Sequence, residues 1–233
     1  MAVKSALTRE KDERIPPRER ILAVAGDLFY RHGIRAVGVD AIAEAAGTNK
    51  MTLYRHFASK DELVAAYLRQ SAELADACWD RFAQAHPGDP LAQLRAWLAE
   101  MAGHVAITDE RGCALANAAV ELPEKNHPAR RVIEEFKVAQ RARLVELSRS
   151  AGLDEPDMLA DELHLLLEGA RVTAQSVGAD GLGARVVRMG EAMIAAHPVK
   201  QGAPALRTRA APGRSITASP RGKTSGRATR RRA

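Results

Sequence analysis

Hydrophobic positions along the chain recur every three or four residues, the spacing that gathers them on one face of an α-helix. The first such pattern covers residues 17–33, and two short ones follow at 40–46 and 49–57. Asn49 is a good N-cap for the second short segment, and Ser59 is placed to cap a longer helix after it. The N-terminal part therefore predicts three helices that lead into a long fourth one.

The rest of the chain repeats this spacing in longer segments, punctuated by proline and glycine. Further helices are expected over residues 91–105, 113–122, 128–152, 157–176 and 183–196. No segment alternates apolar and polar residues as a strand does, and no internal repeat is found. The sequence predicts an all-α protein of about nine helices.

Composition agrees with this prediction. Hydrophobic residues make up 46% of the 233 positions but aromatic residues only 4%, and alanine and leucine abound, which favours helices over sheets. No run of about 18 apolar residues is present, and the charged N-terminus has no apolar segment typical of a secretion signal. We therefore expect no membrane contact and a cytoplasmic protein, associated with the nucleoid when bound to DNA.

The formal net charge of +6 is unevenly distributed. Residues 199–233 contain ten lysines and arginines and no acidic residue, so the rest of the chain is mildly acidic. Their Ala, Gly, Pro, Ser and Arg content cannot bury a core, which predicts a disordered basic tail. This tail is either a nonspecific tether to the phosphate backbone or a solvated appendage. Residues 1–16 are expected to form a flexible arm.

The most informative stretch is residues 33–63, GIRAVGVDAIAEAAGTNKMTLYRHFASKDEL. A short helix, a glycine turn and a second helix are the parts of a helix-turn-helix, in which the second helix enters the major groove. Leu53 and Phe57 are one helical turn apart and predict the buried face of this second helix. The first turn or the outer face of this helix then carries the side chains that can reach phosphates and base edges, namely Lys50, Met51, Thr52, Tyr54, Arg55 and His56.

This stretch resembles the DNA-binding region of the TetR family, whose usual pattern is DIAxxAGVSKGTLYxHF followed by SKEEL. The matching residues are Ile42, Ala43, Ala46, Gly47, Lys50, Thr52, Leu53, Tyr54, His56, Phe57, Ser59, Lys60, Asp61, Glu62 and Leu63. The resemblance implies a homodimeric, ligand-responsive repressor of a palindromic operator in double-stranded DNA. It also implies a helix-turn-helix head (17–62) and a helical ligand-binding and dimerisation domain (63–198).

Within the motif, the resemblance assigns phosphate contacts to Thr52, Tyr54, His56 and Lys60. It assigns contacts with base edges to Lys50, Met51 and Arg55. Gly38, where the family often has Ser or Thr, supplies no side-chain phosphate contact. Thr48-Asn49 replaces the common Val-Ser and Met51 replaces a frequent Gly, so the operator sequence does not follow from the motif.

The C-terminal region is expected to enclose a cavity for a small-molecule effector. Candidate lining residues, polar or bulky positions on otherwise apolar segments, are Trp97, Met101, Cys113, Asn117 and Arg171; ordinary packing is the competing interpretation of each. The resemblance also implies that the last two long helices pair with those of a second copy. The residues predicted at that interface are Leu163, Leu166, Leu167, Ala170, Val187 and Met193.

No pattern of catalytic or metal-ligating residues is apparent, so neither an enzyme nor a cofactor is expected. Glu121, His127, His164 and Glu168 are not spaced to form an acid–base or metal site. Cys78 and Cys113 lack the CxxC spacing of zinc sites. Cys113 follows a glycine at a predicted helix start, which suggests either a reactive sensor thiol or a small buried residue. The alternative to a specific repressor is a constitutive DNA-organising protein whose basic tail dominates binding.

Overall fold

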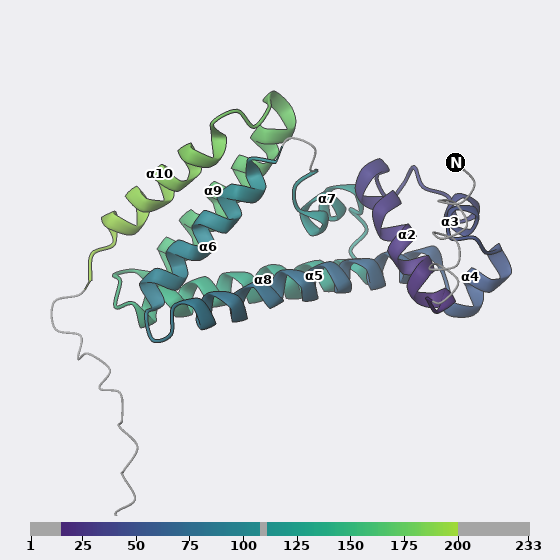
Figure 1. Cartoon of the computed structure of the whole chain (residues 1–233), viewed down its shortest axis with the longest axis horizontal. Coiled ribbons are helices and arrows are strands. Elements are labelled where there is room, and N and C mark those ends of the chain that lie inside the picture. Colours follow the sequence, from purple (N-terminus) through teal and green to yellow (C-terminus); the bar gives the residue numbers. More distant parts are fainter. Residues whose placement is uncertain (1–14, 108–110, 200–233) are drawn as a thin grey trace, which may run out of the picture. The chain divides into compact units, whose positions relative to one another are not determined.

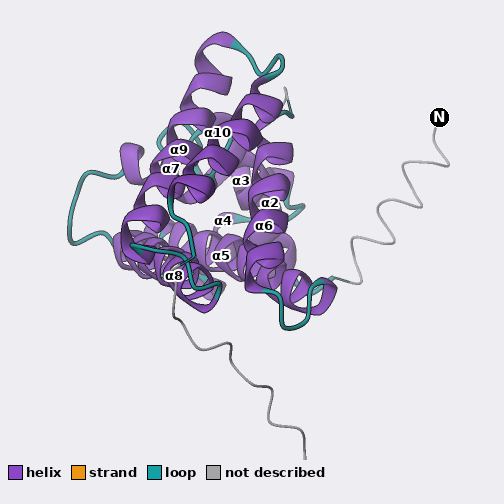
Figure 2. Cartoon of the chain, turned by 90° about the vertical axis from the view of Figure 1, so that its left-hand side faces the viewer, coloured by secondary structure: helices purple, strands orange, loops and turns teal. Residues whose placement is uncertain are grey.

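The computed structural model describes residues 15–107 and 111–199. Over these ranges the chain forms nine helices, and only an isolated bridge between Leu153 and Val199 has β pairing (Figures 1 and 2). The helices are α2 (Pro17–His32), α3 (Val39–Ala45), α4 (Lys50–His56), α5 (Lys60–Ala85), α6 (Pro90–Val105), α7 (Ala114–Glu121), α8 (Pro128–Ser150), α9 (Pro156–Val177) and α10 (Leu182–Ala196). The all-α prediction is confirmed. The predicted arm (1–16), except for its last two residues, and the predicted tail beyond Val199 lie outside the described residues.

Helices α2, α3 and α4 and the first turns of α5 enclose the core of the N-terminal head. Each contributes a fully buried aliphatic side chain, namely Ile21, Ile42, Leu53 and Leu63. Burying a side chain of this size stabilises a fold by about 1.5–3 kcal/mol. The short helices α3 and α4 depend on this core, because isolated helices of their length are unstable in water.

Three helix ends in the head follow the sequence prediction. The Asn49 side chain accepts a hydrogen bond from the Thr52 N–H at 2.8 Å and so caps α4. The Ser59 hydroxyl accepts one from the Glu62 N–H at 3.1 Å and caps α5. Gly33, with φ of 86°, ends α2 in a conformation that L side chains rarely adopt. Local chemistry thus fixes where the head helices start and stop.

Helix α5 is continuous and belongs to two hydrophobic cores. Its residues 63–68 pack in the head core, together with residues of α7 and the start of α8. Trp79 and Phe82, near its other end, pack in a second core. The boundary predicted between residues 62 and 63 therefore does not coincide with a break in packing.

The second core is formed by the far half of α5 with α6, α8, α9 and α10. In Figure 1, α5 and α8 run side by side, and α6, α9 and α10 lie above the half of this pair that is farther from the head. Leu98, Leu144 and Leu163 are buried between these helices. Helix α10 comes very close to α6 at Gly190, where an added Cβ would lie 2.5 Å from the Leu98 side chain. A larger residue here would require a shift of the Leu98 side chain or of one helix.

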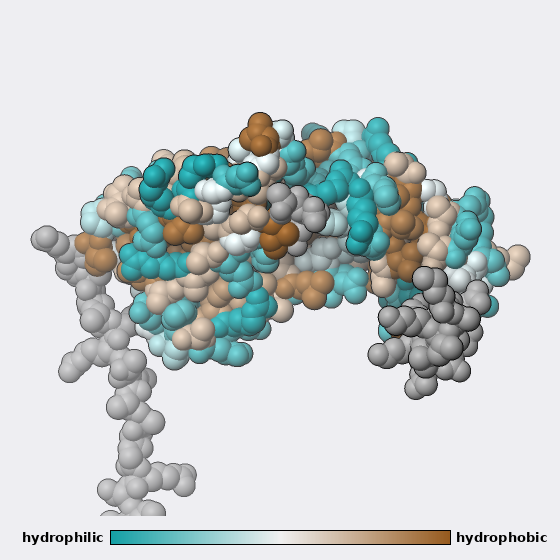
Figure 3. All heavy atoms as spheres, turned by 45° about the horizontal axis from the view of Figure 1, so that its top comes forward, coloured by the Kyte–Doolittle hydropathy of each residue, from teal (hydrophilic) through white to brown (hydrophobic). Residues whose placement is uncertain are grey.

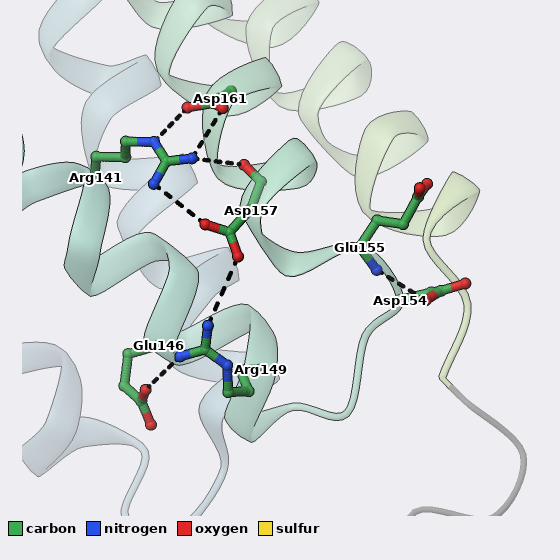
Figure 4. A network of polar contacts seen from close by, with 7 residues as sticks. All are labelled: Arg141, Glu146, Arg149, Asp154, Glu155, Asp157 and Asp161. Carbon is green, nitrogen blue, oxygen red and sulfur yellow. Dashed lines mark hydrogen bonds and ion pairs between the residues drawn. The ribbon is translucent and has the colours of Figure 1, made fainter.

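A network of ion pairs connects the end of α8 to the start of α9 (Figure 4). The Arg141 guanidinium donates to Asp161 at 2.6 Å and to Asp157 at 3.3 Å. Arg149 also pairs with Asp157, at 3.7 Å. The hydrogen bond from Arg141 holds the pKa of the Asp161 carboxyl below its ordinary value. Because these groups are largely exposed, the network orients the two helices more than it stabilises them.

The predicted dimer-interface residues belong to the core of a single chain. Leu163, Leu167 and Ala170 are 0%, 3% and 6% exposed. The remaining three, Leu166, Val187 and Met193, are partly buried against the same core. Leu163, Leu167 and Ala170 are therefore not available to a second copy, because apolar spacing alone does not distinguish the inner face of an apolar helix from its outer face. For Leu166, Val187 and Met193 a place at the interface stays a prediction.

Other apolar residues of these two helices do face outward. On α9 they are Met158, Leu165, Val172 and Val177, and on α10 it is Met189, with 47% to 82% of each residue exposed. Figure 3 shows apolar residues interspersed with polar ones over the face that α9 and α10 help to form. These exposed side chains, rather than the buried ones, are available to a second copy.

Candidate DNA-binding head and interior cavity

Helix α4 is held in the head by its buried face. Leu53 and Phe57 are 0% and 4% exposed, as their spacing predicts. The Arg18 guanidinium lies 5.1 Å from the centre of the Phe57 ring. Arg20 Nε donates to the Ala46 carbonyl oxygen at 2.7 Å and so fixes the turn before α4 to α2. These contacts determine which side of α4 faces solvent.

Four of the predicted DNA contacts lie on the exposed side of α4. Lys50 and Arg55 are exposed, and Met51 and Tyr54 are 84% and 43% exposed. Lys50 Nζ forms an exposed ion pair with Asp40 at 3.3 Å. Such a pair costs little to break, so it does not prevent Lys50 from contacting a base or phosphate. The solvent side of α4 is thus a row of basic, aromatic and thioether groups.

The remaining three predicted contacts are less accessible. Thr52 and His56 are half-buried, and His56 Nε2 is buried with no hydrogen-bond partner among the described residues. His56 is therefore only partly outward, because this residue follows Leu53 by three positions and lies near the buried face; its contact with DNA stays a prediction. Lys60 Nζ is 5.9 Å from the centre of the Phe29 ring, and burial lowers the pKa of this lysine.

A cavity of about 530 Å³ lies between α5, α6, α7, α8 and α9. Four of the five predicted lining residues are on its wall, namely Trp97, Met101, Cys113 and Arg171. Asn117 is not among them; its side-chain amide donates to the Arg111 carbonyl oxygen at 2.6 Å. A volume of this size is typical of small-molecule sites.

One part of the cavity wall is charged. Lys137 Nζ and Arg171 Nη1 donate to the same Glu168 oxygen, Oε1, at 2.8 and 2.6 Å. Burial alone would raise the pKa of Glu168, but the two cations outweigh it and hold that pKa below its ordinary value. For His164, burial and the neighbouring Lys137 lower the pKa, so the imidazole is neutral at neutral pH.

The rest of the wall is mainly apolar and aromatic. The rings of Trp79 and Trp97 stack with centres 6.0 Å apart and an interplanar angle of 15°. Trp79 Nε1 donates to Gln140 at 3.1 Å, so this buried polar group is satisfied. Burial raises the pKa of Tyr67 to about 12, so its hydroxyl stays protonated. The cavity therefore combines one charged region with flat apolar surfaces.

The head contacts the cavity wall through α2. Tyr30, at the end of α2, lines the cavity, and its hydroxyl donates to the Gly112 carbonyl oxygen at 3.1 Å. Arg111 Nη1 donates to the Tyr30 carbonyl oxygen at 3.0 Å. A short chain segment just before α7 is thus fastened to α2 by side chains from both directions.

A second connection lies at the other end of α7. Glu121 Oε2 accepts a hydrogen bond from the Ile34 N–H at 2.6 Å and one from the Arg35 N–H at 3.3 Å. His127, which precedes α8, lies 3.3 Å from the Asp61 carboxylate of α5. The turn after α2 is therefore attached to α7 by a charged acceptor.

The residues that sequence reasoning missed are Lys137, His164 and Glu168 of the charged wall, with Tyr30 and Glu121 of the connections. The available signal was a pair of charges on the apolar helix α9, Glu168 and Arg171, spaced so as to face the same side. Their partner Lys137 is 31 residues from Glu168, and no local pattern indicates that contact.

Neither cysteine forms a disulfide. Cys113 is the N-cap residue of α7 and lines the cavity. A reactive role for it stays a prediction. Cys78 also lines the cavity, and burial raises the pKa of its thiol. Among the described residues no group of histidine, cysteine and acidic side chains is placed to hold a metal ion, and none of the helices there is long and apolar enough to span a membrane.

Comparison with known proteins agrees with this geometry. Residues 21–67 match the family described as "Bacterial regulatory proteins, tetR family". The transcriptional activator FasR of Mycolicibacterium smegmatis is 41% identical over 63 residues, which is 27% of this chain and 27% of FasR. That alignment spans far less than the full length of FasR.

Solved structures extend the similarity beyond the head. A TetR-family transcriptional regulator from Streptomyces coelicolor is 28% identical over 78% of this chain and 95% of its own, with a TM-score of 0.73. A TetR-type regulator from Streptomyces avermitilis is 31% identical over 80% of this chain and all of its own, with a TM-score of 0.68. The chain therefore belongs to the TetR family of DNA-binding transcriptional regulators.

Proposed function

We propose that this regulator is a repressor that binds a palindromic operator as a dimer and releases it when a small molecule enters the cavity. The observation that carries the proposal is the position of Tyr30. It belongs to α2, which packs against α4, and it also forms part of the cavity wall. A ligand that displaces this side chain acts on the head without an intermediate element.

The coupling would use the two connections of α7. A ligand beside Gly112 and Cys113 shifts the start of this helix, and Glu121 at its end transmits the shift to the Ile34 turn. Because a ligand changes an equilibrium only by its differential affinity for two states, it must bind the released state more tightly. Coupling free energies of this kind are about 1–3 kcal/mol.

In the bound state, α4 would lie in the major groove. Lys50, Met51 and Arg55 would contact base edges, Met51 by packing on a thymine methyl group. Tyr54 is the most accessible phosphate contact, whereas Thr52, His56 and Lys60 would meet phosphates along the half-buried edge of the head. The exposed thioether of Met51 has no packing role in the described head, which favours a recognition role.

The dimer would form through the outward faces of α9 and α10. Leu165, Val172 and Met189 are apolar and exposed, and a two-fold interface would bury the same residues on both copies. Two heads related by this axis would then meet two half-sites of a palindrome.

The experiment that tests the proposal is selection of genomic fragments by the purified full-length protein, followed by fluorescence anisotropy with the selected site. We expect a palindrome bound at least about 10³-fold more tightly than random duplex. Equal affinity for random duplex would instead support the DNA-organising alternative driven by residues 199–233. Removing the gene should raise transcription from the selected site, and a fall would identify an activator, as FasR is by name.

A further inference from the structure

The charged part of the cavity wall has more hydrogen-bond donors than acceptors. Lys137 and Arg171 share a single carboxylate oxygen of Glu168. The second terminal nitrogen of Arg171, Nη2, is directed at the Met101 sulfur at 3.6 Å, and a thioether is a weak acceptor. An ammonium has three donors and a guanidinium five, so most of these donors have no acceptor among the described residues.

The same region has an excess of positive charge. Lys137, Glu168 and Arg171 are 23%, 27% and 21% exposed, so water reaches them only in part. Two cations face one carboxylate, and the adjacent His164 is neutral. Buried charge without a counter-charge is costly, because the protein interior solvates ions poorly. An incoming anion would relieve both the charge excess and the lack of acceptors.

The apolar walls define the rest of the ligand. Tyr67, Trp97 and Phe136 line the cavity and offer flat surfaces to a planar body. Aromatic walls also attract cations. Here, however, the only carboxylate among the described lining residues is already neutralised by two cations. Trp79 is also stacked on Trp97 and approached by Arg143 at 5.7 Å. The electrostatics therefore favour an anion over a cation.

We propose that the cavity binds an organic anion, a carboxylate on a flat apolar body, with the carboxylate received by Lys137 and Arg171. Glu168 then acts as the internal counter-ion that holds both cations in place until the ligand arrives. This assignment rests on the proposed function only for its regulatory meaning, since binding itself is measurable without DNA.

Three probes of one shape and different charge test the proposal, namely 2-naphthoate, 2-naphthylmethanol and (2-naphthylmethyl)trimethylammonium. Isothermal titration calorimetry with the full-length protein should give naphthoate at least tenfold tighter binding than the alcohol, and the weakest binding for the ammonium. Alcohol or ammonium binding as tightly as naphthoate would overturn the inference while leaving a ligand-binding cavity intact. No binding of any probe would overturn it as well.

Variants of the charged wall give results of opposite sign. Arg171→Met and Lys137→Met should each weaken naphthoate binding at least tenfold and change alcohol binding less than about twofold. Glu168→Gln should tighten naphthoate binding severalfold, because it removes the competing carboxylate. Arg131→Met, which removes an exposed cation of α8 that pairs with Glu135 outside the cavity wall, is the matched control and should leave naphthoate affinity unchanged. Weaker naphthoate binding in Glu168→Gln would contradict the proposal.

Folding and the regulatory role are checked separately. Thermal melting of each variant shows whether it is folded. If Lys137→Met or Arg171→Met does not fold, Glu168→Gln still tests the inference. Operator binding by the ligand-free protein depends on the head. If the wild-type protein bound no operator, that result would refute the proposed function and leave the ligand class standing. Retained operator binding together with wrong probe selectivity would refute the ligand class alone.

Discussion

Removing the carboxylate of Glu121 should both destabilise the protein and weaken communication between cavity and head. The Ile34 N–H, whose residue is 5% exposed, donates to this carboxylate at 2.6 Å, and the Arg35 N–H adds a longer contact. A hydrogen bond to a charged group contributes about 1.5–3 kcal/mol, and a buried donor left without an acceptor costs about 1–3 kcal/mol. Since the site is only partly buried, Glu121→Ala should cost about 2 kcal/mol.

The conservative variant separates charge from hydrogen bonding. Glu121→Gln keeps an acceptor oxygen and should cost about 1 kcal/mol, since charged bonds are roughly twice as strong as neutral ones. For a domain of about 200 residues, 1 kcal/mol lowers Tm by roughly 2–4 °C. Differential scanning calorimetry should therefore rank wild type above Glu121→Gln and Glu121→Ala lowest. Glu124→Ala is the control, because its exposed ion pair with Arg35 at 3.2 Å contributes less than about 1 kcal/mol.

The regulatory consequence is measured with operator DNA. Anisotropy titrations with and without a cavity ligand give the coupling free energy, which should fall in Glu121→Ala and persist in Glu124→Ala. If Glu121→Ala melts at the wild-type temperature and still releases DNA as wild type does, then Glu121 neither stabilises the Ile34 turn nor transmits the signal.

Further predictions concern helix α4, the dimer, the pH dependence of stability and the basic tail. Tyr54→Ala should weaken operator binding by about 1–3 kcal/mol without lowering Tm, as anisotropy and calorimetry can show; unchanged binding would argue against α4 as the reader. Leu165→Glu should convert the dimer to monomers in analytical ultracentrifugation, and a dimer that persists would place the interface elsewhere. Because burial lowers the pKa of His164 below 6.5, the unfolded chain takes up its proton first, so stability should fall as pH drops from about 6.5, and less so in His164→Asn. Deleting residues 199–233 should reduce affinity for operator and random duplex alike at low salt and raise their ratio, whereas equal affinities before and after deletion would make the tail a solvated appendage.

Local sequence patterns predicted the features of the fold that depend on neighbouring residues. Asn49 and Ser59 cap their helices because an N-cap acts over three residues, and Leu53 and Phe57 are buried because they share one helix face. The inner face of α9 was identified as the interface because Leu163 and Leu167 are as apolar as the outward Leu165. Such a choice depends on which helices of the same chain are nearby, and the spacing within α9 does not contain that information.

The candidate site was predictable only where it is local. The exposed row on α4 follows from a single helix, and the bulky residues Trp97 and Met101 on α6 were recognised as lining a cavity. The hydrogen bond from Ile34 to Glu121 joins residues 87 positions apart. Contacts of this range arise from the packing of whole helices, so the connection between head and cavity became visible only in three dimensions.

Because α5 is one continuous helix, a tilt at one of its ends displaces the other end. At 1.5 Å per residue, its 26 residues span about 39 Å, from the head core at Leu63 to the cavity wall at Trp79 and beyond. A rigid rod of this length converts a tilt of about 5° at one end into a displacement of roughly 3 Å at the other. That is close to the 3.4 Å rise between successive bases along a strand of DNA. Under the proposed function, a tilt of α5 too small to disrupt packing would therefore be enough to carry α4 out of register with its half-site.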